Sequence, residues 1–145
     1  MKALLQRVLE SKLEIEGNEY SKIKRGFLVL LGVTHEDTEE DMKVLAEKIC
    51  KLRVFEDENE KMNLCINDVG GALHIVSQFT LYADCHHGNR PSFTNAAKPD
   101  YANELYEYII QELKKTNIKV ETGIFGADMQ MSLVNDGPVT ILLEK

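Results

Sequence analysis

The sequence predicts an α+β protein in which two main helices accompany a strand-rich, antiparallel sheet that is rolled or barrel-like. Three observations lead to this prediction. Strand patterns follow one another in the opening third of the chain, others close it, and two helical patterns lie between them. A chain of 145 residues, 43% of them hydrophobic, suffices for one domain with an ordinary core. We therefore expect residues 1–145 to form a single domain.

The opening strands are predicted from apolar runs and from alternation. Residues 2–8 have the pattern of a strand, and residues 12–16 alternate strictly, which is typical of a strand with one solvated face. A turn at Gly17-Asn18 leads to a returning strand over residues 19–23. The continuous apolar run over residues 27–31 predicts a central strand.

Two amphipathic helices are predicted next. Thr38 suits the N-cap of the first, with Asp41 three residues later, and apolar side chains recur at helical spacing to about residue 53. Pro99 suits the first turn of the second helix. Lys114 and Lys115 end that helix with the charge that its C-terminal dipole favours.

The remaining strands lie around and after the second helix. Residues 73–76 form an apolar, β-branched run after a turn-like segment, and residues 118–122 and 129–133 alternate. Residues 139–143 predict the last strand.

Charge limits the class of partner. The net charge is −7 and the pI is about 5.1, whereas general nucleic-acid binding depends on neutralising phosphates. An RNA partner would therefore rest on a few local cations, for which Lys2, Arg7 and Arg90 are the weak candidates.

The cysteines and the apolar pattern indicate a compartment. The sequence has three cysteines, an odd number, at Cys50, Cys65 and Cys85, and their spacing is not that of metal ligands. Cys50 and Cys65 have the sequence setting of small core residues. The sequence shows no signal peptide and no long apolar span. We expect a cytoplasmic protein without a membrane partner.

The segment with Cys85, His86 and His87 invites a metal-site hypothesis. Adjacent ligands without a second cluster make a poor zinc site. We expect no metal and no other cofactor, and interpret this irregular segment as a loop near a pocket.

In one stretch, polar residues directly follow a predicted buried strand. Ser77, Gln78 and Thr80 bring two hydroxyls and a carboxamide to a strand end, where unpaired polar groups are costly to bury. Two interpretations stay open at this point: a hydrogen-bonded strand terminus, or a pocket at the end of the strand.

A second stretch lies near the C-terminus. Asn135, Asp136 and Gly137 have turn chemistry, and Pro138 follows at once. Glycine lets a carbonyl approach a ligand closely, and an X-Pro bond is the usual site of a cis peptide. A plain turn fits this stretch equally well when it is taken alone.

Together the two stretches resemble the D-aminoacyl-tRNA deacylase family, the chiral proofreading enzymes of translation. Residues 77–81 read Ser-Gln-Phe-Thr-Leu, similar to its SQxxL signature, and residues 135–140 read Asn-Asp-Gly-Pro-Val-Thr, similar to its NxGPVT signature. The resemblance continues through Gln6-Arg7-Val8, Arg90-Pro91-Ser92-Phe93 and residues 125–130, and so covers the chain. Family members often carry Lys or Arg where His86 and His87 stand, which leaves Arg90 as the cation of that loop.

The resemblance implies an activity and a site. The activity is hydrolysis of the ester of D-aminoacyl-tRNA, which releases the free D-amino acid and tRNA, and it extends to glycyl-tRNA mischarged on tRNA-Ala. The implied catalytic residues are Ser77, Gln78, Phe79 and Thr80, and the implied substrate-binding residues are Gly137, Pro138, Phe125, Met129 and Leu81. The family inserts a cis Gly-Pro pair into the partner's active site, which implies a homodimer.

Two mechanisms remain open. Thr80 as a nucleophile requires an activating base, and the sequence identifies none. We prefer backbone amides around Phe79 and Thr80 that hold the carbonyl oxygen while the ribose 2′-hydroxyl assists a water. Two rival functions are a generic esterase that uses Ser77 or Thr80, and a binding module without catalysis.

Overall fold

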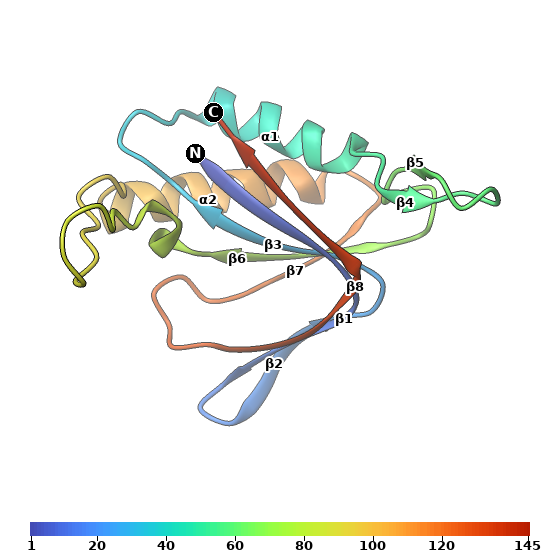
Figure 1. The fold of residues 1–145 in the computed structure, drawn as a ribbon, viewed down its shortest axis with the longest axis horizontal. Helices are drawn as coiled ribbons and strands as arrows, with labels where there is room; N and C mark the ends of the chain where they lie inside the picture. The colour runs from blue at the N-terminus through green and yellow to red at the C-terminus, as the bar shows by residue number, and fades with distance from the viewer.

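The computed structural model describes residues 1–145, in which two helices cover one face of a strongly curved sheet (Figure 1). The helices are α1 (Glu39–Lys51) and α2 (Pro99–Lys114), and a short 3₁₀ helix, η1, spans Phe79–Tyr82. The strands, in chain order, are β1 (Lys2–Ile15), β2 (Asn18–Ile23), β3 (Gly26–Gly32), β4 (Phe55–Glu56), β5 (Met62–Leu64), β6 (Ala72–Ser77), β7 (Lys119–Thr122) and β8 (Gln130–Glu144).

The long strand β1 organises the main sheet. One of its edges pairs with β3 along the first half and with β2 along the second, while β8 pairs along the other edge. The strand order is β2-β1-β3-β6-β7, and β2 also contacts β6 and β7. The sheet therefore curls back on itself, and the predicted rolled α+β fold with two helices is confirmed.

The expectation of a wholly antiparallel sheet is wrong in one respect. Strand β6 runs parallel to both β3 and β7. The reason is the connection: α1 lies between β3 and β6, and α2 lies between β6 and β7, and a crossover of this kind joins parallel neighbours. The sheet is mixed, with a parallel part under the helices and an antiparallel part formed by β1, β2, β3 and β8.

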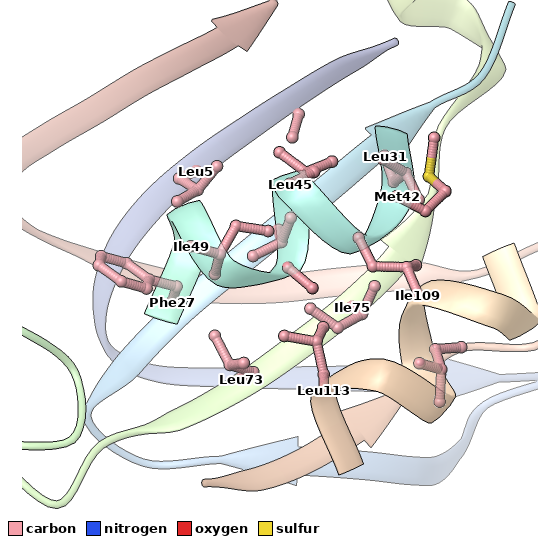
Figure 2. Close-up of a cluster of buried hydrophobic side chains, with 14 of the residues drawn as sticks. Leu5, Phe27, Leu31, Met42, Leu45, Ile49, Leu73, Ile75, Ile109 and Leu113 are labelled. Carbon is pink, nitrogen blue, oxygen red and sulfur yellow. The ribbon is translucent and has the colours of Figure 1, made fainter. Parts of the chain in front are cut away.

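The core lies between the helices and the sheet. Figure 2 shows Leu45 and Ile49 of α1 and Ile109 of α2 over side chains of the strands such as Leu73 of β6. They belong to a cluster of 24 buried hydrophobic residues. A second cluster of six packs inside the roll, on the opposite face of the sheet: Val8, Leu13, Ile23, Leu28, Ala72 and Val76. Neither helix has the length and apolar character that crossing a bilayer requires.

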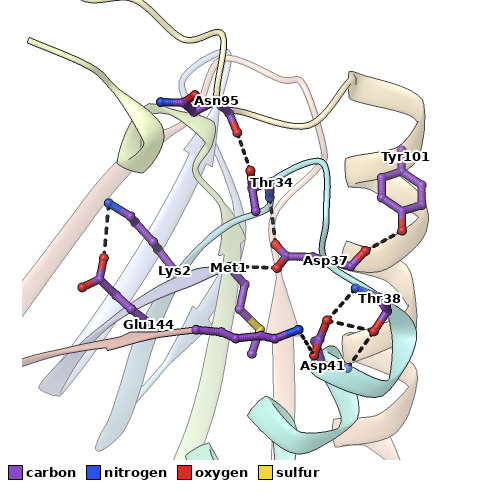
Figure 3. A network of polar contacts seen from close by, with 10 residues as sticks. Met1, Lys2, Thr34, Asp37, Thr38, Asp41, Asn95, Tyr101 and Glu144 are labelled. Carbon is purple, nitrogen blue, oxygen red and sulfur yellow. Dashed lines mark hydrogen bonds and ion pairs between the residues drawn. The ribbon is translucent and has the colours of Figure 1, made fainter.

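Polar contacts fix the start of α1 against α2 and β1 (Figure 3). Thr38 and Asp41 form the predicted capping box, with the Thr38 N–H 2.9 Å from an Asp41 carboxylate oxygen and the Asp41 N–H 3.3 Å from the Thr38 hydroxyl. The Asp37 carboxylate accepts from the Met1 ammonium at 2.6 Å, and the Tyr101 hydroxyl donates to the Asp37 carbonyl. These contacts set where α2 begins, which matters because α2 borders the site below.

The strand β6 is held by a buried histidine. His74 is fully buried, with Nδ1 3.0 Å from the Ser11 hydroxyl and Nε2 2.9 Å from the Ser21 hydroxyl. Since the Ser21 hydroxyl donates to the Thr122 carbonyl at 2.8 Å, it accepts from His74 Nε2, and Nδ1 then accepts from Ser11. One neutral imidazole thus links β1, β2 and β6, with β7 joined through Ser21.

Candidate active site

The predicted polar stretch lies where β6 ends. Strand pairing stops at Ser77, and the Gln78 N–H still donates to the Leu31 carbonyl at 2.7 Å before the chain turns into η1. The turn packs closely on β3, because a Cβ at Gly32 would stand 3.2 Å from Leu81 Cβ. We call residues 77–82 the Ser77 turn.

The Ser77 turn leaves several polar groups free. Phe79 and Thr80 are the first two residues of η1, so their N–H groups have no partner within that helix, and none of the hydrogen bonds of the turns and loops starts from either of them. The Gln78 side-chain amide donates to the Thr80 hydroxyl at 2.5 Å. Two adjacent amide donors therefore lack a partner within their own helix, which suits a site for an oxyanion.

A hollow of about 450 Å³ opens beside this turn, and we call it the apolar hollow. The Phe79 and Phe93 rings meet edge to face there, with centroids 5.0 Å apart, and the Tyr106 and Phe125 rings are 6.0 Å apart. The Tyr106 hydroxyl is already satisfied, since it donates to the Ile75 carbonyl at 2.9 Å. Aromatic walls of this kind accept a flat, apolar-faced ligand.

A second hollow of about 290 Å³ adjoins the first, and we call it the inner hollow. Ser77, Gln78 and Phe79 line both hollows, so the start of the Ser77 turn lies where the two meet. Its other wall includes Asp128 and Met129, which come from the segment that leads into β8. A ligand with two unlike parts joined by a polar group would fit this arrangement.

The second predicted stretch lies elsewhere in the chain. The Gly137-Pro138 bond is cis, as the resemblance implied, and both residues are exposed within β8. Strand register places Asn135 opposite Val8, in line with the start of β6 rather than with its end at Ser77. Five residues along the strands and three strand spacings across them separate the two motifs by about 20 Å. We call residues 135–140 the Gly137 turn.

Arg7 holds the Gly137 turn from below. Its side chain is 4% exposed, Nη1 donates to the Val54 carbonyl at 2.7 Å, and Nε donates to the Asp136 carbonyl at 3.2 Å. Its guanidinium also pairs with the carboxylates of Asp136 and Glu56. The expectation that Arg7 contacts RNA is therefore wrong, because a buried guanidinium that is already paired cannot reach a phosphate.

The other predicted cations differ in their freedom. The Lys2 ammonium is 3.2 Å from Glu144 and lies over the Tyr82 ring, so it is already engaged. Arg90 is exposed in the loop and forms no ion pair. In the same loop His86 lies 2.6 Å from the Asp84 carboxylate, and hydrogen bonds from the His86 backbone and side chain lower the Asp84 pKa.

Comparison with known proteins identifies the family. The family described as D-Tyr-tRNA(Tyr) deacylase matches residues 4–144. The chain belongs to this family. It is 58% identical over 144 residues to the D-aminoacyl-tRNA deacylase of Thermosipho africanus and 53% identical to that of Clostridioides difficile, each match covering 99% of this chain and 97% of the relative.

Solved structures show the same fold. One described as c-Myc DNA Unwinding Element Binding Protein is 40% identical and superposes with a TM-score of 0.94, covering all of this chain and 99% of its own. Another, described as a probable eukaryotic D-amino acid tRNA deacylase, has a TM-score of 0.82 over 98% of this chain and 97% of its own. At 16% identity the second supports the fold alone.

The structure brings together only part of the residue set that the family resemblance implied. Ser77, Gln78, Phe79, Phe125 and Met129 line the two hollows. Leu81 packs against the end of β3 and, like the exposed Thr80, lines neither hollow, and Gly137 and Pro138 lie far from both.

Sequence reasoning missed two aromatic residues that line the apolar hollow, Phe93 and Tyr106. Tyr106 belongs to the helical stripe that read as core, and it is indeed buried, at 1% exposure. Its second role, as the floor of a hollow, has no signature in spacing.

Proposed function

We propose that the chain hydrolyses the ester that joins a D-amino acid to the terminal ribose of tRNA, and that it does so in the cytoplasm. The observation that carries the proposal is the start of η1, whose first two N–H groups have no helical partner, with Phe79 at the junction of the two hollows and Thr80 directly after it. The names of relatives that are 53–58% identical over almost the whole chain support the same substrate class.

In this proposal each hollow takes one part of the substrate. The terminal nucleoside occupies the apolar hollow, against aromatic rings such as Phe125, and the aminoacyl group enters the inner hollow beside Met129. The ester carbonyl then lies at their junction. Its oxygen accepts from the amides of Phe79 and Thr80, which stabilise the negative charge that develops when the carbonyl carbon is attacked.

The attacking oxygen is that of water in this mechanism. Water adds to the carbonyl carbon, the bond from that carbon to the ribose oxygen breaks, and the neighbouring ribose 2′-hydroxyl assists the proton transfers. The products are the free D-amino acid and tRNA with both ribose hydroxyls restored. The protein contributes shape and backbone dipoles and requires no cofactor or metal.

The contacts of Thr80 favour this mechanism over an acyl-enzyme. Its hydroxyl accepts from the Gln78 amide, and no histidine or carboxylate forms a hydrogen bond with it. A hydroxyl nucleophile needs a base that removes its proton. His74, which is also on β6, is engaged on both ring nitrogens by serines and is fully buried.

We further propose that the Gly137 turn of a second copy completes the site. The turn is exposed, it cannot reach the hollows of its own chain, and Phe79 at the junction is 56% exposed, which leaves an apolar surface for a partner. A two-fold symmetric homodimer would place each Gly137 turn at the other subunit's hollows. Its carbonyls would crowd one side of the substrate α-carbon and reject an L side chain.

A pocket that only rejects L side chains does not recognise the identity of the side chain. Glycine has no side chain to reject, so we propose that glycyl-tRNA mischarged on tRNA-Ala is also hydrolysed. Mass measurement in solution tests the dimer, since a monomeric, active enzyme would remove the partner's Gly137 turn from the mechanism.

One assay separates the proposal from its rivals. D-tyrosyl-tRNA, L-tyrosyl-tRNA, D-tyrosyl-adenosine and a simple ester such as p-nitrophenyl acetate are incubated with the protein, and ester loss is followed. The proposal expects loss of the D-esters alone. A generic esterase would cleave the simple ester, and a binding module would bind D-tyrosyl-adenosine without cleaving it.

A further inference from the structure

The residues that line the two hollows contain a single positive charge, Lys98. Lys98 lies at the outer wall of the apolar hollow, directly before α2, and it is exposed. Its ammonium group forms no ion pair and no hydrogen bond within the chain. A net charge of −7 makes a free cation at the mouth of a hollow more notable, because most of the surface repels an anion.

The local structure does not account for a lysine at this position. Lys98 occupies the N-cap of α2 but makes no side-chain hydrogen bond to the helix. Ser, Thr, Asp or Asn would cap the helix, and a positive charge at this end opposes the helix dipole. Lys98 therefore costs its own helix a little stability while it borders a hollow. Residues that break a local stability rule in this way are found at functional sites.

We infer that Lys98 is a substrate-positioning residue, which pairs with a phosphate of the tRNA 3′ strand while the terminal nucleoside occupies the apolar hollow. The inference rests on the proposed function. The terminal nucleoside is attached to the strand by a phosphate, and a chain leaving the hollow must pass its mouth. The cations that the sequence suggested do not line either hollow, and Arg7 is buried while Lys2 is paired with Glu144.

The test compares Lys98→Gln with Lys114→Gln. Lys114 is a matched control because it is exposed, forms no ion pair, and lies at the other end of α2, about 24 Å away along a helix that rises ~1.5 Å per residue. Kinetics are measured with D-tyrosyl-tRNA, which has the phosphate, and with D-tyrosyl-adenosine, which has none. Lys98→Arg serves as the conservative variant.

For tRNA we expect Lys98→Gln to lower kcat/KM by about two- to fivefold through KM, the range of a solvent-exposed ion pair. The slope of log kcat/KM against log salt should become shallower by about 0.7, the share of one phosphate of a single strand. Lys98→Arg should restore both values. Lys114→Gln should match the wild type, and D-tyrosyl-adenosine should be hydrolysed equally by all four proteins.

Two results would overturn the inference. If Lys98→Gln and Lys114→Gln lose kcat/KM on tRNA equally, the effect comes from the overall charge of the protein and not from a contact of Lys98. If Lys98→Gln loses as much kcat/KM on D-tyrosyl-adenosine as on tRNA, the substitution has changed the shape of the hollow. If the wild type hydrolyses neither ester, the proposed function fails instead. Binding of a fluorescent single-stranded RNA ending in CCA, with the same variants and salt series, then tests Lys98 alone, and equal affinities of Lys98→Gln and wild type would refute it.

Discussion

The Ser77 turn and the Gly137 turn carry the two motifs that the sequence singles out, yet the structure treats them differently. The Ser77 turn borders two hollows and offers two unpaired amides. The Gly137 turn borders neither hollow and is anchored from beneath by Arg7. Under the proposed mechanism one chain holds most of a site, and its Gly137 turn serves the site of a second copy. The two turns, the Arg7 anchor and the buried His74 of β6 can each be changed separately.

The largest effect is expected from Gly137→Ala. Gly137 has φ +122°, and a Cβ there would stand 2.8 Å from Val139 Cγ2 and 3.1 Å from an Arg7 nitrogen, so the turn must shift. A shift of about 1 Å costs on the order of 100-fold in activity if the turn contacts substrate. Deacylation of D- and L-tyrosyl-tRNA measures both the rate and the discrimination.

Gly17→Ala is the matched control for that variant. Gly17 also has a positive φ, +77°, but a Cβ there would meet no atom within 4 Å, and the residue lies in the turn between β1 and β2. Its backbone strain should cost ~1 kcal/mol of stability and leave activity unchanged. Wild-type rate and selectivity in a folded Gly137→Ala enzyme would reduce the Gly137 turn to an ordinary turn.

The buried His74 of β6 makes the stability of the fold sensitive to acid. Burial lowers the pKa of His74 to about 4, a shift that nearby Glu121 only partly opposes, whereas an unfolded histidine titrates near 6.5. The unfolded state therefore takes up the proton first, and stability present above pH 6.5 is lost as the pH falls towards 4.

We expect the free energy of unfolding to fall by about 2–3 kcal/mol between pH 7.5 and 4.5 on account of His74. Urea unfolding at a series of pH values measures it, and His74→Gln should remove that part of the slope. His87→Gln, at an exposed position, is the control. If His74→Gln does not fold, NMR titration of the wild type replaces it, and a His74 pKa near 6.5 would contradict the expectation.

Arg7→Lys should affect the other turn alone. A lysine keeps the charge but cannot donate to the carbonyls of Val54 and Asp136 at once, so the expected loss of stability is about 2 kcal/mol. We expect roughly tenfold lower activity, because the Gly137 turn loses its support. The salt dependence of activity should not change, since Arg7 is 4% exposed.

Arg25→Lys is the control for that measurement, because Arg25 is exposed and lies over the Phe55 ring without an ion pair. It should leave activity unchanged. A shallower salt slope in Arg7→Lys would return Arg7 to the list of RNA contacts.

Periodicity and capping chemistry predict most of the fold. The box formed by Thr38 and Asp41 and the apolar stripes of both helices appear in the structure where the sequence indicates them. The parallel pairing of β6 was also readable, since a strand, a helix and a strand in succession favour it.

The site could be predicted less completely from the sequence than the fold, for a physical reason. The two motifs were found because glycine, proline and polar residues stand out among apolar runs, but spacing along a chain does not state which surfaces meet. Arg7 read as an exposed cation, and only the fold shows that it lies beneath β8. The sequence singled out no role for Lys98, and only the fold shows that it lines the apolar hollow.

The smallest effect is expected from Thr80→Ala, which separates the two mechanisms open for the Ser77 turn. The alanine keeps the backbone N–H, and the lost hydroxyl only accepts from Gln78. If the amides stabilise the oxyanion, kcat should stay within about threefold of the wild type, a barrier change below ~0.7 kcal/mol. Thr94→Ala, at another exposed threonine near the site, is the control. If Thr80 is the nucleophile, the variant should lose nearly all activity, and rapid acid quenching of the wild type with labelled D-tyrosyl-tRNA should trap an acyl group on the protein. Loss of activity together with a trapped acyl group would establish Thr80 as the nucleophile. A retained rate without a trapped acyl group would exclude it, because an enzyme that forms the intermediate on a hydroxyl cannot lose that hydroxyl and keep its rate.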